Sequence, residues 1–196
     1  MQSTHESRSV SRFGEPDEAA LPADIAEIYE TNRTKLGFVP NVFRAYAKRP
    51  EHFRAFMHYH DVLMKGPSGL SRAEREAIVV AVSSENQCQY CMTAHGAALR
   101  ILGKDAELAE QIANNWQTAQ LTPRLRAMLQ FASYVNEPGF AATDDDIDEL
   151  RAQGFSDDDM WDIAAIAAFF GFSNRMAGFM DMRPNAEFYT MGRSTK

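Results

Sequence analysis

Cysteine is scarce in this chain, and its two copies lie together. Among 196 residues, only Cys88 and Cys91 are cysteines, and two residues separate them. Two cysteines are too few for a framework of structural disulfides. The first ten residues are polar and lack the apolar segment of a secretory signal. This combination favours a reducing compartment, with a redox-active or metal-binding pair, and we expect a cytoplasmic protein.

Long apolar runs and clusters of basic residues are also missing. The longest apolar run, residues 163–170, is much shorter than the roughly 18 residues typical of a membrane-spanning helix. The net charge is −7, and Lys and Arg do not gather in one stretch. A basic surface for nucleic acid is therefore not expected. We predict a protein that binds no nucleic acid and enters no membrane.

Patterns typical of β-strands are absent, because apolar and polar residues rarely alternate strictly. Apolar residues instead recur at three- and four-residue spacing, as at Phe53, Phe56 and Met57. Short segments with Pro and Gly separate these stretches, as expected for the connections between helices. We predict an all-α protein of about nine helices, with a flexible N-terminal arm over residues 1–20 and a single helical domain over 21–196. Val10 and Phe13 are candidates for docking onto a neighbour.

Two helix starts resemble each other and hint at a weak internal repeat. Residues 70–75 and 121–126 both run from a leucine through a hydroxyl cap to charged residues and an apolar helix. The halves would be a CxxC half over about 50–115 and a second half over about 120–183. The acidic runs 144–146 and 157–159 also follow hydroxyl caps, so we interpret them as first-turn charges on helix dipoles, not as calcium ligands.

The two cysteines and a histidine form the main candidate site. In a predicted helix over about 87–102, Cys88, Cys91 and His95 share one face. The cysteines are close enough for a disulfide, and the helix start favours a thiolate at Cys88. His95 follows Cys91 by one turn and is placed to accept or relay its proton. Two alternatives stay open: a pair of buried core cysteines, or a zinc site with only three ligands.

Five further polar residues each have more than one possible role. Glu76 and Glu85 are the acids within reach, and Glu76 is either partly buried or part of an exposed charged face. Tyr90 either donates a hydrogen bond near the sulfurs or packs. Asn174 and Arg175 interrupt an apolar helix, where we favour a structural role over an ion pair or a subunit bridge.

Together these residues resemble a known family. The order Glu76, Cys88-Gln89-Tyr90-Cys91 and His95 is similar to that of the alkyl hydroperoxidase D (AhpD) / carboxymuconolactone decarboxylase superfamily, in its peroxidase-related branch. The likeness covers about residues 20–183. Further similar stretches are Leu70-Ser71, Arg75-Glu76, residues 150–157 (LRAQGFSD) and residues 172–175 (FSNR).

The resemblance implies an all-helical AhpD-like fold that assembles as trimers or hexamers, and a thiol peroxidase site without cofactor or metal. Cys91 would be the peroxidatic thiol, Cys88 the resolving thiol, and Glu76 with His95 the proton relay. Tyr90 stands where well-studied members carry a histidine, so one relay member is changed. The decarboxylase members lack the CxxC pair, which argues against their chemistry here.

We therefore expect a thiol-dependent peroxidase whose substrate is a peroxide and whose partner is a thiol or dithiol reductant. The sulfenic acid formed on Cys91 would condense with Cys88 to a disulfide. The alternative is a dithiol–disulfide relay or redox-sensing oligomer that turns over little peroxide. A homo-oligomer is also expected because the helices over 51–65 and 157–180 carry more apolar surface than a monomer of this size readily buries.

Overall fold

The structure is a computed structural model that describes residues 9–193, and over that range it is all-α, as predicted. No strand occurs among the described residues. The nine α-helices of this range are α1 (Ala23–Leu36), α2 (Asn41–Tyr46), α3 (Pro50–Lys65), α4 (Arg72–Glu85), α5 (Gln89–Gly103), α6 (Ala106–Asn115), α7 (Pro123–Asn136), α8 (Asp144–Ala152) and α9 (Asp157–Met180). Three short 3₁₀ helices accompany them: η1 (Glu18–Ala20) before α1, η2 (Trp116–Thr118) between α6 and α7, and η3 (Ala186–Tyr189) after α9.

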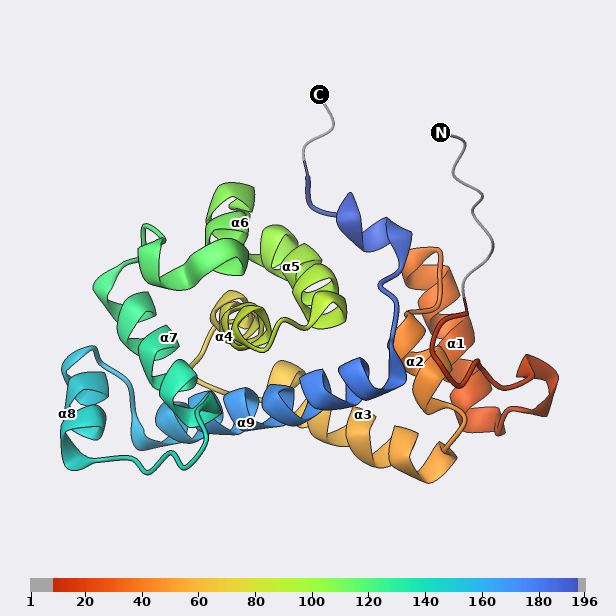
Figure 1. The fold of residues 1–196 in the computed structure, drawn as a ribbon, viewed down its shortest axis with the longest axis horizontal. Helices are drawn as coiled ribbons and strands as arrows, with labels where there is room; N and C mark the ends of the chain where they lie inside the picture. The colour runs from red at the N-terminus through yellow and green to blue at the C-terminus, as the bar shows by residue number, and fades with distance from the viewer. Residues whose placement is uncertain (1–8, 194–196) are drawn as a thin grey trace.

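Helix α4 is the centre of the fold. Figure 1 views it end-on, with α5, α6, α7 and α9 arranged around it, and all four pack against it. Every residue from 75 to 83 is buried. The helix begins at a capping box, in which Ser71 Oγ accepts from the Glu74 N–H and Glu74 accepts from the Ser71 N–H. A helix enclosed in this way can hold a carboxylate such as Glu76 away from solvent.

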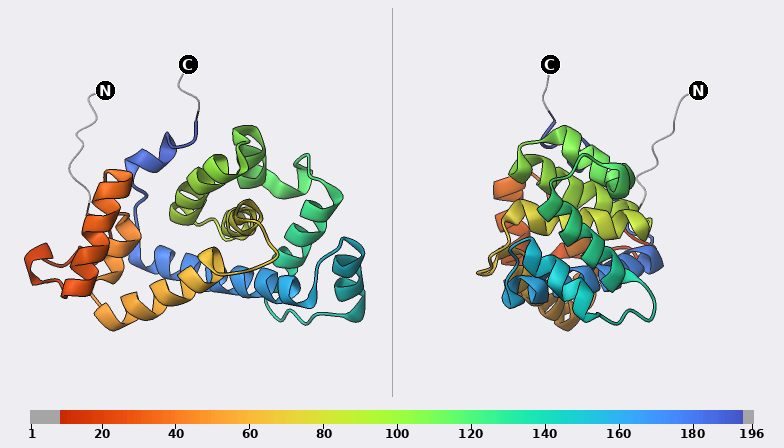
Figure 2. Two further views of the ribbon diagram at one scale, coloured as in Figure 1. Left: turned by 180° about the vertical axis from the view of Figure 1, so that it is seen from behind. Right: turned by 90° about the vertical axis from the view of Figure 1, so that its left-hand side faces the viewer.

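Helix α9 is long and packs along one side of the domain. It runs beneath α4 and α7 and reaches α3 (Figures 1 and 2). Among the described residues it alone is long and apolar enough to span a membrane by composition. Ile163, Ile166 and Phe170 on this helix are almost fully buried inside the domain. Its apolar sequence is therefore explained by packing in the core.

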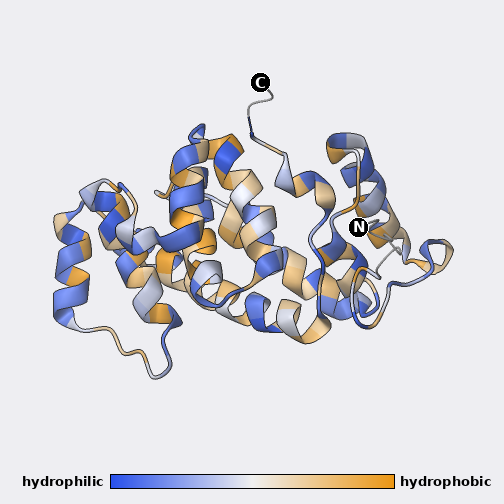
Figure 3. Ribbon diagram, turned by 45° about the horizontal axis from the view of Figure 1, so that its top comes forward, coloured by the Kyte–Doolittle hydropathy of each residue, from blue (hydrophilic) through white to orange (hydrophobic). Residues whose placement is uncertain are grey.

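The helix starts that the sequence indicated are present. Ser71 and Thr122 cap α4 and α7, so the two similar stretches do open helices. The acidic runs lie in the first turns of α8 and α9, behind the caps Thr143 and Ser156. Apolar and polar residues alternate around the outer helices (Figure 3). The internal repeat itself stays a prediction.

The described part of the N-terminal arm lies against the chain's own C-terminal segment. The Arg12 N–H donates to the Met180 carbonyl at 2.6 Å, and the Arg183 N–H donates to the Val10 carbonyl at 3.1 Å. Val10 is buried, and the Phe13 ring is 5.3 Å from that of Phe179. Both docking residues thus meet their own chain. The flexibility of the arm stays a prediction, and residues 1–8 lie outside the described range.

Candidate active site

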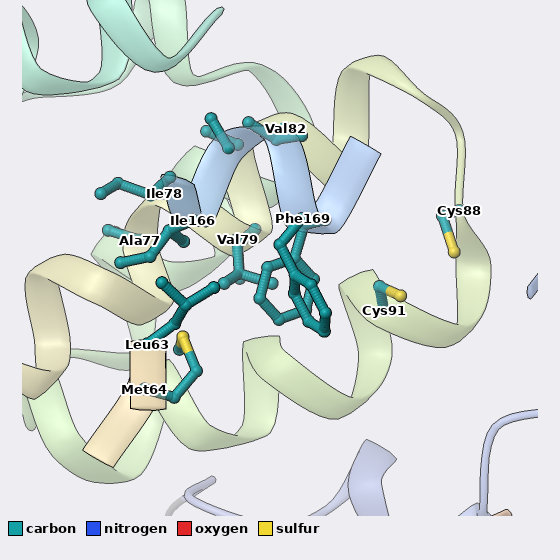
Figure 4. Packing of buried hydrophobic residues seen from close by; sticks show 14 of the residues in the cluster. Leu63, Met64, Ala77, Ile78, Val79, Val82, Cys88, Cys91, Ile166 and Phe169 are labelled. Carbon is teal, nitrogen blue, oxygen red and sulfur yellow. The ribbon is translucent and has the colours of Figure 1, made fainter. Parts of the chain in front are cut away.

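The CxxC pair straddles the start of α5. Helix α4 ends at Glu85, and Gln87 turns the chain with a left-handed φ of 53°. The Cys88 N–H donates to the Ser83 carbonyl at 2.9 Å, which fixes Cys88 as the residue before the helix. The helix therefore begins two residues later than the predicted start near 87. Cys91 lies in the first turn, and its sulfur points to the side on which Cys88 lies (Figure 4).

The two thiols are free, buried and electrostatically linked. A hydrogen bond from the Cys91 thiol lowers the pKa of Cys88 to about 6, with help from the N–H groups of the first turn and from Asn174. The same contact with Cys88, together with burial, raises the pKa of Cys91. The two thiols therefore titrate as a coupled pair, in which Cys88 ionises before Cys91.

Glu76 and His95 form a buried acid–base pair. Glu76 comes from α4 and His95 from α5, and His95 Nδ1 lies 2.7 Å from Glu76 Oε2. Their side chains are only 12% and 17% exposed, so water screens the contact weakly. Phe170 packs edge-on against the imidazole, with ring centres 4.7 Å apart. Because the Glu76 carboxylate accepts a hydrogen bond at Nδ1, the imidazole proton stays on Nδ1. Nε2 is then the nitrogen that can accept a second proton.

Tyr90 is a structural anchor as well as part of the site wall. Its hydroxyl oxygen accepts a hydrogen bond from the Val42 N–H at 3.0 Å and so ties α5 to α2. The residue is buried, and this burial raises the pKa of its hydroxyl. The phenol therefore stays protonated and is unsuited to act as a base.

One cavity of about 200 Å³ brings most of the predicted residues together. Its wall includes Cys91, His95, Glu76 and Tyr90 but not Cys88. The remaining wall is largely apolar, with two further polar members; it comprises Pro40, Val42, Phe43, Phe56, Met57, His60, Ala94, Ala98, Phe170, Ser173 and Phe188. A small molecule in this cavity would contact Cys91, whereas Cys88 is not part of the cavity wall.

Three residues near the site were not predicted. The Asn174 amide helps to lower the pKa of Cys88, and Asn174 and Ser173 partly offset the rise in the pKa of Cys91 that Cys88 and burial cause. Asn174 is itself held by Ser83 Oγ, to which its Nδ2 donates at 3.0 Å. His60 from α3 joins the cavity wall. The sequence gives two indications of Asn174: it is polar within an apolar helix, where a structural role is favoured, and it lies with Ser173 in the family-like stretch 172–175.

Two of the charged residues considered in the sequence lie apart from the cavity. Glu85 accepts from Trp116 Nε1 at 2.8 Å and from Ser133 Oγ at 2.6 Å, so it joins α4 to η2 and α7. Arg175 is exposed and donates to the Gly171 carbonyl of its own helix at 2.6 Å. Glu76, not Glu85, is the acid that contacts His95.

No metal centre is evident in the part of the chain that the structure describes, where no three His, Cys, Asp or Glu side chains converge. His95 has its Nδ1 bound to Glu76, and Cys88 does not line the cavity that Cys91 lines. The site therefore consists of a dithiol next to an acid–base pair.

Known proteins share this sequence and fold. The carboxymuconolactone decarboxylase family model matches residues 50–134. A protein from Ralstonia eutropha JMP134, described as an alkylhydroperoxidase AhpD core and an uncharacterized peroxidase-related protein, is 52% identical over 97% of this chain and 100% of its own, with a TM-score of 0.94. A peroxidase-related protein from Silicibacter sp. TM1040 is 40% identical over the same shares, with a TM-score of 0.90.

A more distant structure shares the fold alone. The debrominase Bmp8 is 23% identical over 93% of this chain and 95% of its own, with a TM-score of 0.75. Among curated proteins, none matches the chain.

Proposed function

This chain belongs to the AhpD-like carboxymuconolactone decarboxylase superfamily, in its peroxidase-related branch, and we propose that it is a thiol-dependent hydroperoxide reductase. Members of this superfamily are enzymes. The observation that carries the peroxidase assignment is the cavity in which Cys91 stands with the Glu76–His95 pair.

The first step transfers a proton and then an oxygen atom. His95 Nε2 takes the Cys91 proton, while Glu76 on Nδ1 stabilises the imidazolium that results. The Cys91 thiolate attacks the terminal oxygen of the hydroperoxide, the O–O bond breaks, and a sulfenic acid forms on Cys91. The departing alkoxide takes up a proton and leaves as an alcohol.

The second step uses the lowered pKa of Cys88. With a pKa of about 6, Cys88 is already a thiolate at neutral pH. It attacks the Cys91 sulfur, expels hydroxide, which becomes water, and closes a disulfide. An external thiol or dithiol then reduces this bond. The lowered pKa thus supports Cys88 as the resolving thiol, and the cavity supports Cys91 as the attacking one.

The thiolate at Cys88 also favours a second candidate function. A thiolate of low pKa beside a helix start is suited to disulfide exchange with a partner, without any peroxide. A relay of this kind would exchange rapidly with oxidised lipoamide and react with peroxides no faster than a free thiol. Comparing the two oxidants separates the candidates.

Loss of thiols after mixing reduced protein with cumene hydroperoxide tests the peroxidase assignment. The native protein should lose both thiols far faster than free cysteine does, and Cys91→Ser should reduce the reaction to that of a free thiol. Hydrogen peroxide serves as a second substrate for the same comparison. If Cys91→Ser oxidises Cys88 as fast as the native protein does, the roles given to the two cysteines are wrong.

A further inference from the structure

A second histidine–carboxylate pair lies at the same cavity. His60 from α3 lines it together with Cys91 and His95. The centres of the two imidazole rings are 6.2 Å apart, and Phe170 packs against both, at 6.3 Å from His60 and 4.7 Å from His95. The two rings therefore approach one small space from two helices that are separated in sequence.

The partner of His60 is Asp61. His60 Nδ1 lies 2.9 Å from Asp61 Oδ1, and Lys65 Nζ lies 2.8 Å from the same carboxylate. The hydrogen bond from His60, followed by Lys65, lowers the pKa of Asp61 to about 2, so this carboxylate is an anion at any working pH. Because Nδ1 is held by this carboxylate, Nε2 is the ring nitrogen that is left for a contact in the cavity.

The first step of the proposed reaction needs a proton donor in addition to a base. His95 receives the Cys91 proton, while the departing alkoxide must gain one as the O–O bond breaks. Tyr90, which lies between the cysteines, has its oxygen bound to the Val42 N–H and a raised pKa. Among the side chains of the cavity wall, His60 is the remaining one with an ionisable nitrogen.

We propose that His60 is a catalytic acid of this site, which donates its Nε2 proton to the leaving alkoxide of an organic hydroperoxide while Cys91 attacks. The thiol proton goes to His95, the proton on His60 goes to the alkoxide, and transfer from His95 back to His60 restores both rings. This inference rests on the proposed peroxidase function. In this proposal the two imidazoles of the cavity have opposite roles: His95 accepts a proton and His60 donates one.

The identity of the leaving group provides the test. An alkoxide from cumene hydroperoxide is a poor leaving group that needs a proton, whereas the carboxylate released by peracetic acid needs none. Single-turnover oxidation of reduced His60→Gln should be about 100-fold slower than native with cumene hydroperoxide, and changed less than about threefold with peracetic acid. Asp61→Asn, at a half-exposed position, should lose rate in the same selective way but to a smaller extent.

His58→Gln is the matched control, because it removes an exposed imidazole from the same helix and should leave both rates unchanged. Equal rate losses with the two oxidants, or no loss with either, would overturn the role of His60 while the peroxidase assignment stands. Native protein that reacts with both oxidants no faster than free cysteine would overturn both.

Discussion

At the scale of single residues, the charge on the dithiol is set by a small number of polar neighbours. Cys88 is stabilised as an anion by the Cys91 thiol, the first-turn N–H groups and the Asn174 amide. Asn174 is oriented by Ser83 Oγ on one side and by Asn86 Nδ2, which donates to its Oδ1 at 3.0 Å, on the other. Asn174 is therefore held in place on both sides, and its amide favours the ionised form of the dithiol.

Asn174→Ala should move the ionisation of the dithiol to higher pH. In the native protein the pKa of Cys88 is depressed to about 6, so its thiolate is present above that pH and is lost as the pH falls through it. Without the amide, the midpoint of the thiolate absorbance should lie above the native one. Cys88→Ser should abolish this early titration altogether. An unchanged midpoint in Asn174→Ala would show that the amide does not stabilise the anion.

The residues of the site divide by how far apart they lie in sequence. Cys88, Cys91 and His95 are predictable from their spacing along one helix, whereas Glu76, on the helix before it, is assigned to the site by the family resemblance. His60 and Asn174 come from α3 and α9, and only the packing of these helices around α4 brings them to the sulfurs. The spacing of residues within one helix does not show how the helices pack together. From the sequence, His60 therefore appears as part of a buried helix face.

At the scale of helices, capping residues explain where most elements begin. The hydroxyl caps of α4, α7, α8 and α9 are local patterns, and each is visible in the sequence. The start of α5 is different, because it is fixed by the left-handed Gln87 and by the contact of the Cys88 N–H with Ser83. No side-chain pattern encodes this start, which is why it was placed too early.

Two matched caps give a test of stability at this scale. Ser156 caps α9 and donates to Asp159, which is buried, whereas Thr143 caps α8 and donates to Asp146, which is only partly buried. Ser156→Ala should lower the free energy of unfolding by about 1–2 kcal/mol, since it removes a cap and leaves a buried carboxylate less satisfied.

Thr143→Ala should lower the free energy of unfolding by less, because water can replace the lost hydrogen bond at Asp146. Urea unfolding of both variants measures the difference. A larger cost at Thr143 than at Ser156 would show that burial of the capped carboxylate does not decide the effect.

At the scale of the whole molecule, one side of the domain is unusually apolar. Tyr59 and Val62 on α3 and Phe172 and Phe179 on α9 are between 46% and 58% exposed. Tyr46, Phe56, Phe169 and Met176 line a groove beside Tyr59 and Phe172. Exposed apolar patches of this kind mark protein–protein contacts more often than free surface.

We expect this face to join copies of the chain in a homo-oligomer, as the family resemblance implies for trimers or hexamers. Sedimentation of the native protein at micromolar concentration should show a species several times the 22.0 kDa of one chain. Phe172→Glu should shift it towards the monomer, because a charge in an apolar contact is costly. Leu36→Glu, at another exposed apolar position on α1, is the control. A native species of one chain would contradict an obligate oligomer.

The central claim is that Cys91, inside the cavity, attacks the peroxide, and that Cys88 resolves the product. The most direct measurement locates the first sulfenic acid. Reduced Cys88→Ser is mixed with one equivalent of cumene hydroperoxide, the sulfenic acid is trapped with dimedone, and the modified peptide is identified by mass. The account predicts an adduct on Cys91, formed at close to the native rate of oxidation, and no comparable adduct on Cys88 in Cys91→Ser. An adduct that forms rapidly on Cys88 in Cys91→Ser, with Cys91 unmodified in Cys88→Ser, would contradict it.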